Sequence, residues 1–408
     1  MSSIRADSKT PYAIVIGLDT LNGIQTVRIL ARHKIPIIAF AKDPSHHGCR
    51  TRLCEQIIFT NTASPELIKS LLALGPRLKQ KAVLIPCVDM NVLLISRHRH
   101  ELEPWYYVVL PDADVIETLM NKLNFYTFAE QNGFPIPQTR YLNTREDAER
   151  AAAELTFPCV LKPPMSAIPE WEKNSKLKAY RLTNPVELLQ IYEQSKVWAK
   201  DLIVQEWVEG PDSNLFSCNC YFNAQFEPVV TFVARKLRQW PPVTGESSLG
   251  EECRDDVVLN ETLRLFRCAH LYGLGYVEIK RSIHSGKYFI IEPNIGRPTG
   301  RSPIAEAGGV ELLYTMYCDT LGLPLPENLE QKYKGVKWID LRRDVQSAIY
   351  HIREGDLTIK GWWQSLQGKK AHALFAWNDP GPFFGDLVRA VRLYTIPEER
   401  SRRDYRNL

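Results

Sequence analysis

YVEIKRSIHSGKYFIIEPN, residues 276–294, decides the fold of this chain. Two β-rich segments flank the sequence His284-Ser285-Gly286. This sequence predicts a three-residue hairpin loop with Gly286 in the left-handed conformation. Closing the hairpin around Ser285 places Ile283 opposite Lys287.

The same closure places Glu278 opposite Glu292, so that two carboxylates face each other across neighbouring strands. The alternation of side chains puts six residues on one face: Tyr276, Glu278, Lys280, Ile290, Glu292 and Asn294. Like charges directly opposite each other destabilise a sheet, so a cation is expected between them. Carboxylate and amide oxygens suit Mg²⁺, which commonly bridges protein carboxylates to nucleotide phosphates. The alternative is an exposed sheet face on which Lys280 neutralises both acids.

Two arginines follow the hairpin at glycine-spaced positions, in the order Gly296, Arg297, Gly300 and Arg301. Guanidinium groups bind phosphate or carboxylate bidentately, and glycine lets the backbone approach such a ligand closely. Solvated surface arginines would not require the glycines. The segment therefore favours an anion-binding role for Arg297 and Arg301.

Strands and helices alternate over the first 112 residues. Strands are expected at Tyr12 to Ile16, Ile35 to Ala41, Ala82 to Pro86 and Tyr107 to Leu110, with helices at Ile24 to His33 and Pro65 to Leu74. This alternation predicts a parallel sheet and a Rossmann-like domain over 1–112. The turn from Gly17 to Gly23 lacks the GxGxxG spacing of dinucleotide-binding proteins, but Asp43 after the second strand keeps a nicotinamide-binding alternative open.

From about residue 140 the strands become shorter and predict an α+β unit. They are expected at Cys159 to Lys162, Leu202 to Trp207, Phe216 to Phe222, Val229 to Lys236, Gly275 to Arg281 and Tyr288 to Glu292. Residues 326–408 are expected to form an appended helical extension. The predicted fold class is therefore α/β followed by α+β.

The composition excludes several classes of protein. The chain has 408 residues, enough for more than one domain. Its formal net charge of +4 is too small to imply a nucleic-acid partner. No stretch reaches the roughly 18 apolar residues that a membrane span requires, and the first residues lack the apolar core of a secretion signal. We expect a cytoplasmic protein with no nucleic-acid partner and no membrane span.

The order of these motifs resembles that of the ATP-grasp superfamily, specifically the carboxylate–amine ligases that are similar to D-aspartate ligase. The likeness runs to about residue 325, and it implies an ATP-grasp domain over 113–325 with the nucleotide between two α+β lobes. It implies that Glu278, Glu292 and Asn294 hold two Mg²⁺ ions, for which Mn²⁺ can substitute. It also implies three catalytic residues: Arg297, Lys162 and Arg301.

Three further segments carry the resemblance. The first combines Lys122 with the downstream sequence Gly133-Phe134-Pro135-Ile136-Pro137. The second is the strand that ends at Lys162, and the third is the hinge segment Val204 to Asp212. The implied ATP-binding residues are Lys122, Lys162, Lys178, Gln205, Glu206, Val208 and Asp212. In this resemblance, backbone groups of Glu206 and Val208 bind the adenine edge and Asp212 accepts from the ribose hydroxyls. The loop Pro163 to Pro169, glycine-rich in many relatives, contains no glycine here.

A basic cluster, Arg235-Lys236-Leu237-Arg238, precedes Thr244 to Gly250, which we expect to be flexible. In a strand, Lys236 and Arg238 share one face and Arg235 takes the other, so at least one should point into the nucleotide cleft. The resemblance implies that this cluster lies near the acyl acceptor and that Asp89 faces the same cleft. The alternative is an exposed basic strand edge that opposes aggregation.

These features predict an ATP-dependent ligase that activates a carboxylate as an acyl phosphate and couples it to an amine, releasing ADP and phosphate. The expected partners are small-molecule carboxylate and amine substrates, and a homodimer is compatible with the resemblance. A thiol acceptor is an alternative within the same family. Two alternatives come from other classes of protein, a nicotinamide-dependent oxidoreductase and a non-catalytic ATP-binding sensor. The full set of metal ligands argues against the sensor.

Overall fold

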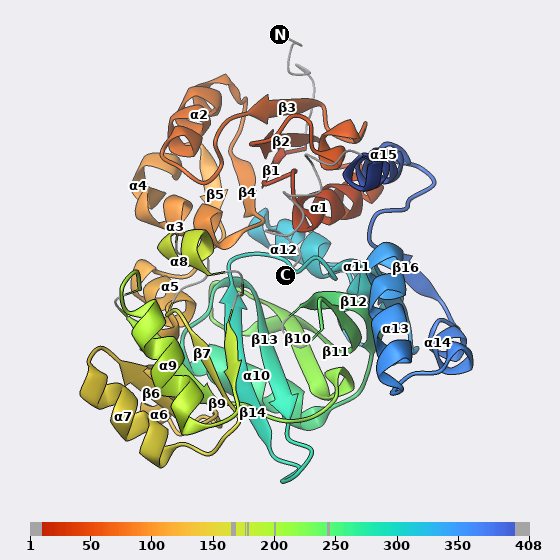
Figure 1. Ribbon diagram of the computed structural model, residues 1–408. Coiled ribbons are helices and arrows are strands. Elements are labelled where there is room, and N and C mark those ends of the chain that lie inside the picture. Colours follow the sequence, from red (N-terminus) through yellow and green to blue (C-terminus); the bar gives the residue numbers. More distant parts are fainter. Residues whose placement is uncertain are drawn as a thin grey trace.

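The computed structural model describes residues 10–164, 169–175, 177, 179–199, 201–242 and 245–395. These residues form three β-sheets with helices packed against them (Figure 1). The N-terminal sheet lies at the top of Figure 1, a large sheet occupies the centre and a small sheet lies at the lower left. No helix among the described residues is long and apolar enough to cross a bilayer.

The N-terminal sheet is parallel and has the strand order β3-β2-β1-β4-β5. Its elements are β1 (Ala13–Ile16), α1 (Leu21–Arg32), β2 (Ile37–Ala41), the 3₁₀ turn η1 (His47–Arg50), β3 (Gln56–Phe59), α2 (Glu66–Leu74), η2 (Gly75–Arg77), β4 (Ala82–Pro86), α3 (Asp89–Arg97), α4 (Arg99–Leu102) and β5 (Tyr106–Val108). The predicted parallel sheet and four of its five strands are confirmed. The fifth, β3, was not predicted because this edge strand is short, begins with a polar residue and is only half-buried.

The small sheet is antiparallel, with the order β6-β9-β7-β8. The segment that contains it comprises α5 (Ala113–Met120), α6 (Lys122–Gln131), β6 (Thr139–Leu142), α7 (Arg145–Glu154), β7 (Cys159–Lys162), α8 (Pro169–Asn174), β8 (Tyr180–Leu182), α9 (Pro185–Ser195) and β9 (Leu202–Glu206). Its apolar face packs against α7 and α9 in a core of its own. This separate core makes the segment a distinct lobe.

The large sheet has seven strands in the order β14-β13-β10-β11-β12-β15-β16. Its elements are η3 (Asp212–Asn214), β10 (Leu215–Phe222), β11 (Pro228–Trp240), β12 (Glu246–Glu252), α10 (Asp256–Cys268), β13 (Gly273–Arg281), β14 (Tyr288–Ile295), α11 (Pro303–Gly308), α12 (Leu312–Thr320), β15 (Lys337–Ile339), α13 (Leu341–Glu354), α14 (Ile359–Ser365), β16 (Lys370–His372) and α15 (Gly381–Thr395). One apolar core joins this sheet to the N-terminal one, since it contains Ile14, Phe40, Val277 and Ile290.

Two sequence expectations are wrong in this region. Residues 246–250 of the segment expected to be flexible belong to β12, which pairs on both sides, with β11 and β15, whereas Thr244 lies outside the described residues. The segment from residue 326 is not purely helical, because β15 and β16 extend the large sheet.

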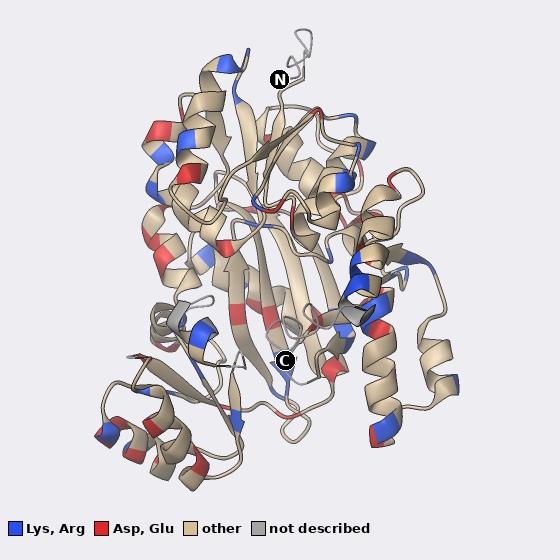
Figure 2. Cartoon of the chain, turned by 45° about the horizontal axis from the view of Figure 1, so that its top comes forward, with Lys and Arg blue, Asp and Glu red and all other residues tan. Residues whose placement is uncertain are grey.

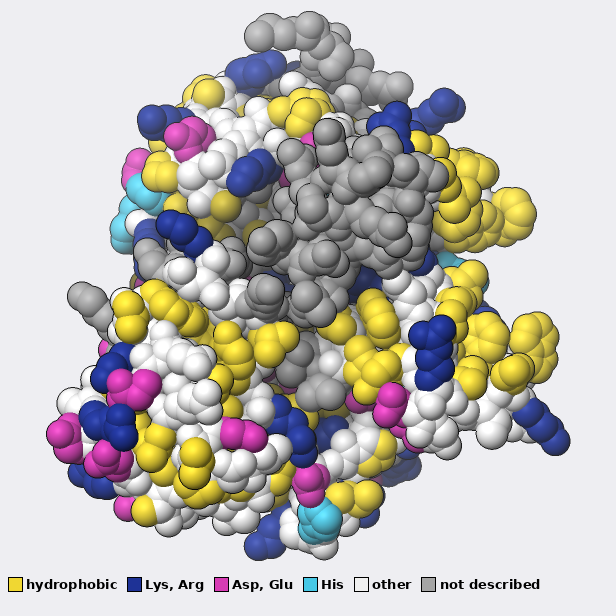
Figure 3. All heavy atoms as spheres, in the orientation of Figure 1, with side chains coloured by type: hydrophobic (Ala, Val, Ile, Leu, Met, Phe, Trp, Pro, Cys, Tyr) yellow, Lys and Arg dark blue, Asp and Glu magenta, His cyan; other side chains and the backbone are white. Residues whose placement is uncertain are grey.

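The last helix of this segment, α15, returns to pack beside η1 of the N-terminal domain (Figure 1). Hydrophobic side chains gather at the right margin of Figure 3, where Figure 1 places α14 and the loop that leads to α15.

Candidate active site

The β13–β14 hairpin has the pairing that was expected at its functional end. Glu278 is the cross-strand partner of Glu292, and Tyr276 is the partner of Asn294. The expected pairing at the loop end is wrong, because the Ser282 N–H donates to the Lys287 carbonyl at 2.9 Å. Gly286 has a φ of +67°, as predicted.

A register shift next to Glu278 reconciles the two ends of the hairpin. Beyond the shift, Ile279 pairs with Ile290, and both side chains are buried in the core. Ile291, rather than the expected Ile290, therefore lies on the face that carries the two glutamates.

This face of the hairpin lines a cleft of about 830 Å³ between the three sheets. Figure 2 shows acidic residues on adjacent strands of the large sheet, with basic residues nearby. Most of the predicted site residues line the cleft: Asp89, Lys122, Lys162, Gln205, Glu206, Val208, Lys236, Glu278, Glu292, Asn294, Arg297 and Arg301. Residues from distant parts of the chain are thus brought together.

Each of the two facing glutamates has its own basic neighbours. Lys122 Nζ lies 3.6 Å from Glu292 Oε2, and Asn121 caps the N-terminus of α6 so that Lys122 begins this helix. Lys236 Nζ and Arg301 Nη2 lie 3.8 and 3.6 Å from Glu278 Oε1. Burial acts to raise the pKa of Glu292, but the nearby cations, above all Lys122, lower it overall. Glu292 is therefore a carboxylate at neutral pH.

Lys162 lies at the end of β7 with its ammonium group inside the cleft. Its Nζ donates to Gln205 Oε1 at 2.9 Å and to the Tyr126 hydroxyl at 3.0 Å. Gln205 Nε2 in turn donates to Thr139 Oγ1 at 2.8 Å, which fixes the orientation of the amide. Burial lowers the pKa of Lys162 to about 8, and Glu292 partly opposes this shift. The position of this cation is set by neutral hydrogen-bond acceptors.

Arg297 connects the hairpin to the N-terminal domain. Its guanidinium pairs with Asp89, the first residue of α3, and donates to the Tyr276 hydroxyl at 3.0 Å and to Asn294 Oδ1 at 2.7 Å. Although burial acts in the opposite direction, Tyr276 and Asp89 raise the pKa of Arg297. Arg297 is thus a fixed cation beside the two glutamates.

The two glycines that space Arg297 and Arg301 make close contacts with the N-terminal domain. Gly296 has a φ of +72°, and a Cβ there would lie 2.6 Å from Leu110 Cδ2. A Cβ on Gly300 would lie 2.9 Å from Asn22 Oδ1. These glycines let the arginine-bearing loop pack directly against the N-terminal domain. Asn22 Nδ2 also donates to the Pro298 carbonyl at 3.1 Å.

Some of the predicted residues of the hinge segment line the cleft and others do not. The Glu206 N–H donates to the Gln138 carbonyl at 2.9 Å, while Glu206 and Val208 both line the cleft. Asp212 lies behind Gln239 and accepts from the Gln239 N–H at 3.1 Å and from its Nε2 at 2.8 Å. Burial raises the pKa of Asp212. Lys178 and residues 165–168 of the expected phosphate loop lie outside the described residues.

Only one member of the basic cluster on β11 lines the cleft, namely Lys236. Arg238 is buried and forms two hydrogen bonds of 2.9 Å to the carboxylate of Asp344 on α13. Arg235 pairs with Glu251 at 3.0 Å near the surface. Register shifts around Arg238 interrupt the alternation, so Lys236 and Arg238 do not have the shared role expected from a regular strand.

Several lining residues were not predicted from the sequence, among them Glu246, Ser247, Trp338 and Arg343. Trp338 on β15 pairs with Gly250 on β12, and a Cβ on Gly250 would lie 3.7 Å from Arg301 Cδ. Among the described residues, the buried Trp338 Nε1 has no hydrogen-bond partner. Strand pairing places Glu246 and Ser247 beside β11 and Trp338 beside β12, and no local motif marks these positions.

The oxygen atoms on the hairpin suit a divalent cation. Two carboxylates and an amide oxygen are the hard ligands that Mg²⁺ prefers. The contacts of both glutamates with neighbouring cations are longer than hydrogen bonds, so their oxygens remain available as ligands. Asn294 Oδ1 accepts from Arg297 and keeps a second lone pair. The donor set therefore fits a magnesium site.

Comparisons with known proteins bear on this fold. No family model matches the chain. It is 27% identical over 235 residues to a D-aspartate ligase from Enterococcus faecium, covering 55% of this chain and 54% of the relative. The chain thus spans about half the length of that curated relative. It is also 24% identical over 104 residues to a D-alanine–D-alanine ligase from Pseudomonas fluorescens, covering 26% of this chain and 29% of the relative.

Solved structures have the same fold over most of the chain. An N5-carboxyaminoimidazole ribonucleotide synthetase in complex with ADP aligns with a TM-score of 0.63 and 15% identity, covering 84% of this chain and 86% of its own. An L-amino acid ligase from Bacillus licheniformis aligns with a TM-score of 0.62 and 13% identity, covering 81% and 79%. The chain therefore has the ATP-grasp fold, and it resembles carboxylate–amine ligases, as its sequence predicts.

Proposed function

We propose that this protein is an ATP-dependent ligase that joins a carboxylate to an amine through an acyl phosphate. The pairing of Glu278 with Glu292 in a cleft that also holds Lys122, Lys162 and Arg297 is the observation that carries this proposal. Facing carboxylates surrounded by cations suit metal-assisted phosphoryl transfer, in which positioning and charge neutralisation supply most of the catalysis. The names of the curated relatives support the same activity.

Glu278, Glu292 and Asn294 are the proposed ligands of two Mg²⁺ ions, for which Mn²⁺ can substitute. When bound, the metal neutralises the charge that develops on the phosphates. Lys122 and Lys162 supply further positive charge to the phosphates, with Lys178 as a proposed additional contact.

The hinge segment is the proposed adenine site. Because the Glu206 N–H already donates to Gln138, Glu206 would contribute its carbonyl, and Val208 would contribute its N–H. Gln205 acts by holding Lys162. A ribose contact from Asp212 requires that its carboxylate be shared with Gln239, so Gln239 is an additional candidate.

Phosphoryl transfer begins when a substrate carboxylate oxygen attacks the γ-phosphorus of ATP. The bond between the γ-phosphorus and the oxygen that bridges it to the β-phosphorus then breaks, which releases ADP. The amine then attacks the acyl carbon, and phosphate leaves with the former carboxylate oxygen. Arg297, held by Asp89 and Tyr276, lies where it can stabilise the transferred phosphoryl group. A thiol acceptor would follow the same first step.

The substrate carboxylate is proposed to bind beside Arg301 and Trp338. The guanidinium contacts of Arg301 are 3.3 Å to Ser217, 3.5 Å to Ser247 and 3.6 Å to Glu278, which leaves it poorly satisfied. Trp338 supplies an indole N–H that no described residue accepts. Lys236 and Asp89 remain candidate substrate residues. Arg235 and Arg238 would act only indirectly, given their partners.

The domain organisation is also proposed. It comprises a Rossmann-like unit over 1–112, a two-lobed ATP-grasp domain over 113–325, and an extension over 326–408 that adds strands as well as helices. A homodimer and a cytoplasmic location are further proposals, which sedimentation analysis and cell fractionation would test.

An isotope experiment tests the reaction path. Single amino acids and pairs of amino acids are first screened for ATP-dependent phosphate release. The active carboxylate is then labelled with heavy oxygen. We expect the label in inorganic phosphate and ADP as the nucleotide product. Labelled AMP with pyrophosphate would instead show adenylate chemistry and refute the proposed mechanism.

A further inference from the structure

A second group of ligand-type side chains lies outside the cleft, at the junction of the N-terminal domain and the large sheet. His33 follows α1, Glu306 belongs to α11, and Glu311 immediately precedes α12. Within the described part of the chain, these three form the one group of His, Cys, Asp and Glu residues whose ligand atoms all lie within 4.8 Å of one another. None of the three lines the cleft.

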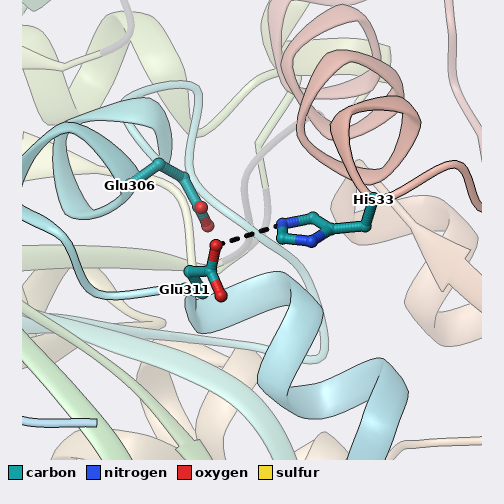
Figure 4. A group of neighbouring side chains, drawn as sticks. All are labelled: His33, Glu306 and Glu311. Carbon is teal, nitrogen blue, oxygen red and sulfur yellow. Dashed lines mark ion pairs between the residues drawn. The ribbon is translucent and has the colours of Figure 1, made fainter. Parts of the chain in front are cut away.

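The three side chains converge on a common point. Figure 4 shows the carboxylates of Glu306 and Glu311 directed toward the imidazole of His33. His33 Nε2 lies 3.3 Å from Glu311 Oε1. Glu306 Oε1 is shielded from solvent and has no hydrogen-bond partner among the described residues. A buried oxygen without a partner is unusual in a folded protein and requires an explanation.

The imidazole is held in place independently of the two acids. The ring of His33 stacks on Tyr314 of α12, with a centroid separation of 3.7 Å and an interplanar angle of 7°. Stacking occupies the face of the ring and leaves the Nε2 edge directed at the carboxylates. The orientation of the imidazole is therefore fixed before any ligand binds.

Two neighbouring carboxylates repel each other when both are ionised. Burial and the nearby Glu311 raise the pKa of Glu306 to about 8, and Arg32 opposes this shift only in part. A bound cation would provide the missing partner for Glu306 Oε1 and offset the repulsion between the acids.

We propose that His33, Glu306 and Glu311 form a binding site for a divalent transition-metal ion of the Zn²⁺ type. An imidazole nitrogen with carboxylate oxygens suits zinc, whereas magnesium prefers oxygen ligands alone. Bonds of about 2.0–2.1 Å in tetrahedral geometry put neighbouring ligand atoms about 3.3 Å apart. The separation of His33 Nε2 from Glu311 Oε1 matches this spacing.

Such an ion would act as a clamp between two parts of the chain. It would tie the C-terminal end of α1 to α11, and α11 begins directly after the loop that carries Arg297 and Arg301. The proposed site is independent of the proposed ligase activity, since it uses no residue of the cleft.

The test uses the full-length protein after removal of metal by a chelator. Zn²⁺, and Co²⁺ as a spectroscopic probe, are titrated in the presence of excess Mg²⁺, which occupies sites composed only of oxygen ligands. We expect one ion per chain, a tetrahedral-type Co²⁺ absorption spectrum and an increase in melting temperature. His33→Gln and Glu306→Gln should each weaken binding by at least about 100-fold, because even loss of a supporting residue around a metal weakens binding 10–100-fold.

Two matched variants control for other histidines. His100 is almost fully exposed, and His46 lies beside another imidazole, that of His47. His100→Gln and His46→Gln should leave the Zn²⁺ titration and the Co²⁺ spectrum unchanged. Glu306→Gln replaces a buried carboxyl group of raised pKa with a neutral amide of similar size. It should fold at least as well as the wild type without metal, so that its loss of binding would not reflect unfolding.

Three results would overturn the proposal. One is a wild-type protein that binds neither ion in the micromolar range. Another is equal binding by the wild type and both ligand variants. The third is a melting temperature that changes with pH through Glu306 but not with Zn²⁺, since the cluster would then be a protonation site only.

Discussion

Glu278 and Glu292 are direct cross-strand partners, and the described residues give each of them different neighbouring cations. Glu278 has Lys236 and Arg301 as neighbours, and Glu292 has Lys122. All three contacts are between 3.6 and 3.8 Å, longer than hydrogen bonds. The cations therefore compensate the charge of the pair while leaving its oxygens accessible from the cleft.

Removing one of these charges should abolish most of the turnover. Glu292→Gln retains the size of the side chain, but a neutral amide balances the positive charge of a metal poorly. We expect the chemical step to slow by at least about 100-fold with an unchanged far-UV spectrum. Glu227→Gln, which removes an exposed glutamate paired with Arg267, is the control and should be fully active. Normal turnover in a folded Glu292→Gln protein would contradict the metal assignment.

Ligand-dependent thermal stability separates the nucleotide hypotheses. ATP with Mg²⁺ should raise the melting temperature, because a ligand at 100 times its dissociation constant stabilises the folded state by about 2.7 kcal/mol. NAD and NADP should cause no shift. The opposite pattern would favour an oxidoreductase.

The affinity for ATP should fall as pH rises above about 8. Burial holds the pKa of Lys162 at about 8 in the free protein, so the ammonium that attracts phosphate is charged below this pH and neutral above it. Calorimetry should show affinity decreasing by up to about tenfold per pH unit above the pKa.

Lys280 must be separated from this effect. Burial also lowers the pKa of Lys280 to about 8, although its Nζ donates to the carbonyls of Gly210 and Pro211. Lys162→Gln should remove most of the pH dependence, and Lys280→Gln should retain it. The reverse result would assign the titration to Lys280.

The indole N–H of Trp338, which has no hydrogen-bond partner among the described residues, should contribute to substrate binding. Trp338→Phe removes this donor and should raise KM for the carboxylate substrate about 10-fold with little change in kcat, since a hydrogen bond to a charged group contributes about 1.5–3 kcal/mol. Trp363→Phe is the matched control, because the Trp363 side chain is exposed. An unchanged KM for every substrate would remove Trp338 from the binding site.

Two arginines on β11 allow the contributions of a buried and a partly exposed ion pair to folding stability to be compared. Arg238→Met leaves the buried carboxylate of Asp344 without its main partner and should destabilise the fold by about 3–5 kcal/mol. Arg235→Met breaks a partly exposed pair with Glu251 and should destabilise by at most about 1 kcal/mol. Urea unfolding would compare them, and equal losses would contradict this reading of the pairs.

Local chemistry predicted part of this structure well. The facing glutamates were predicted correctly, although the expected loop closure was one residue out and the register shift compensates for it. The parallel sheet followed from its apolar runs. The register shift beside Glu278 was not predictable, because it depends on the packing of Ile290 in the hydrophobic core. β12 was missed because its serines and glycine have low strand propensity, and neighbouring strands on both sides override that preference.

Residues contributed by distant segments were beyond the reach of sequence patterns. Asp344 neutralises Arg238 across 106 positions of chain, and no local signal in the basic cluster identifies this partner. Trp338 enters the cleft only because β15 pairs with β12. The sequence spacing of Lys236 and Arg238 predicts that both side chains lie on one face of a regular strand. The register shifts around Arg238 interrupt this alternation, so the two residues have different partners.

The pairing of β15 with β12 determines how the chain can be shortened. A truncation at residue 325 would leave the backbone groups of β12 unpaired along one side and would remove the carboxylate that neutralises buried Arg238. An open strand edge recruits strands from other molecules, and an uncompensated buried charge favours unfolding. The C-terminal segment is therefore part of the folding unit, and a minimal soluble fragment has to extend through α13.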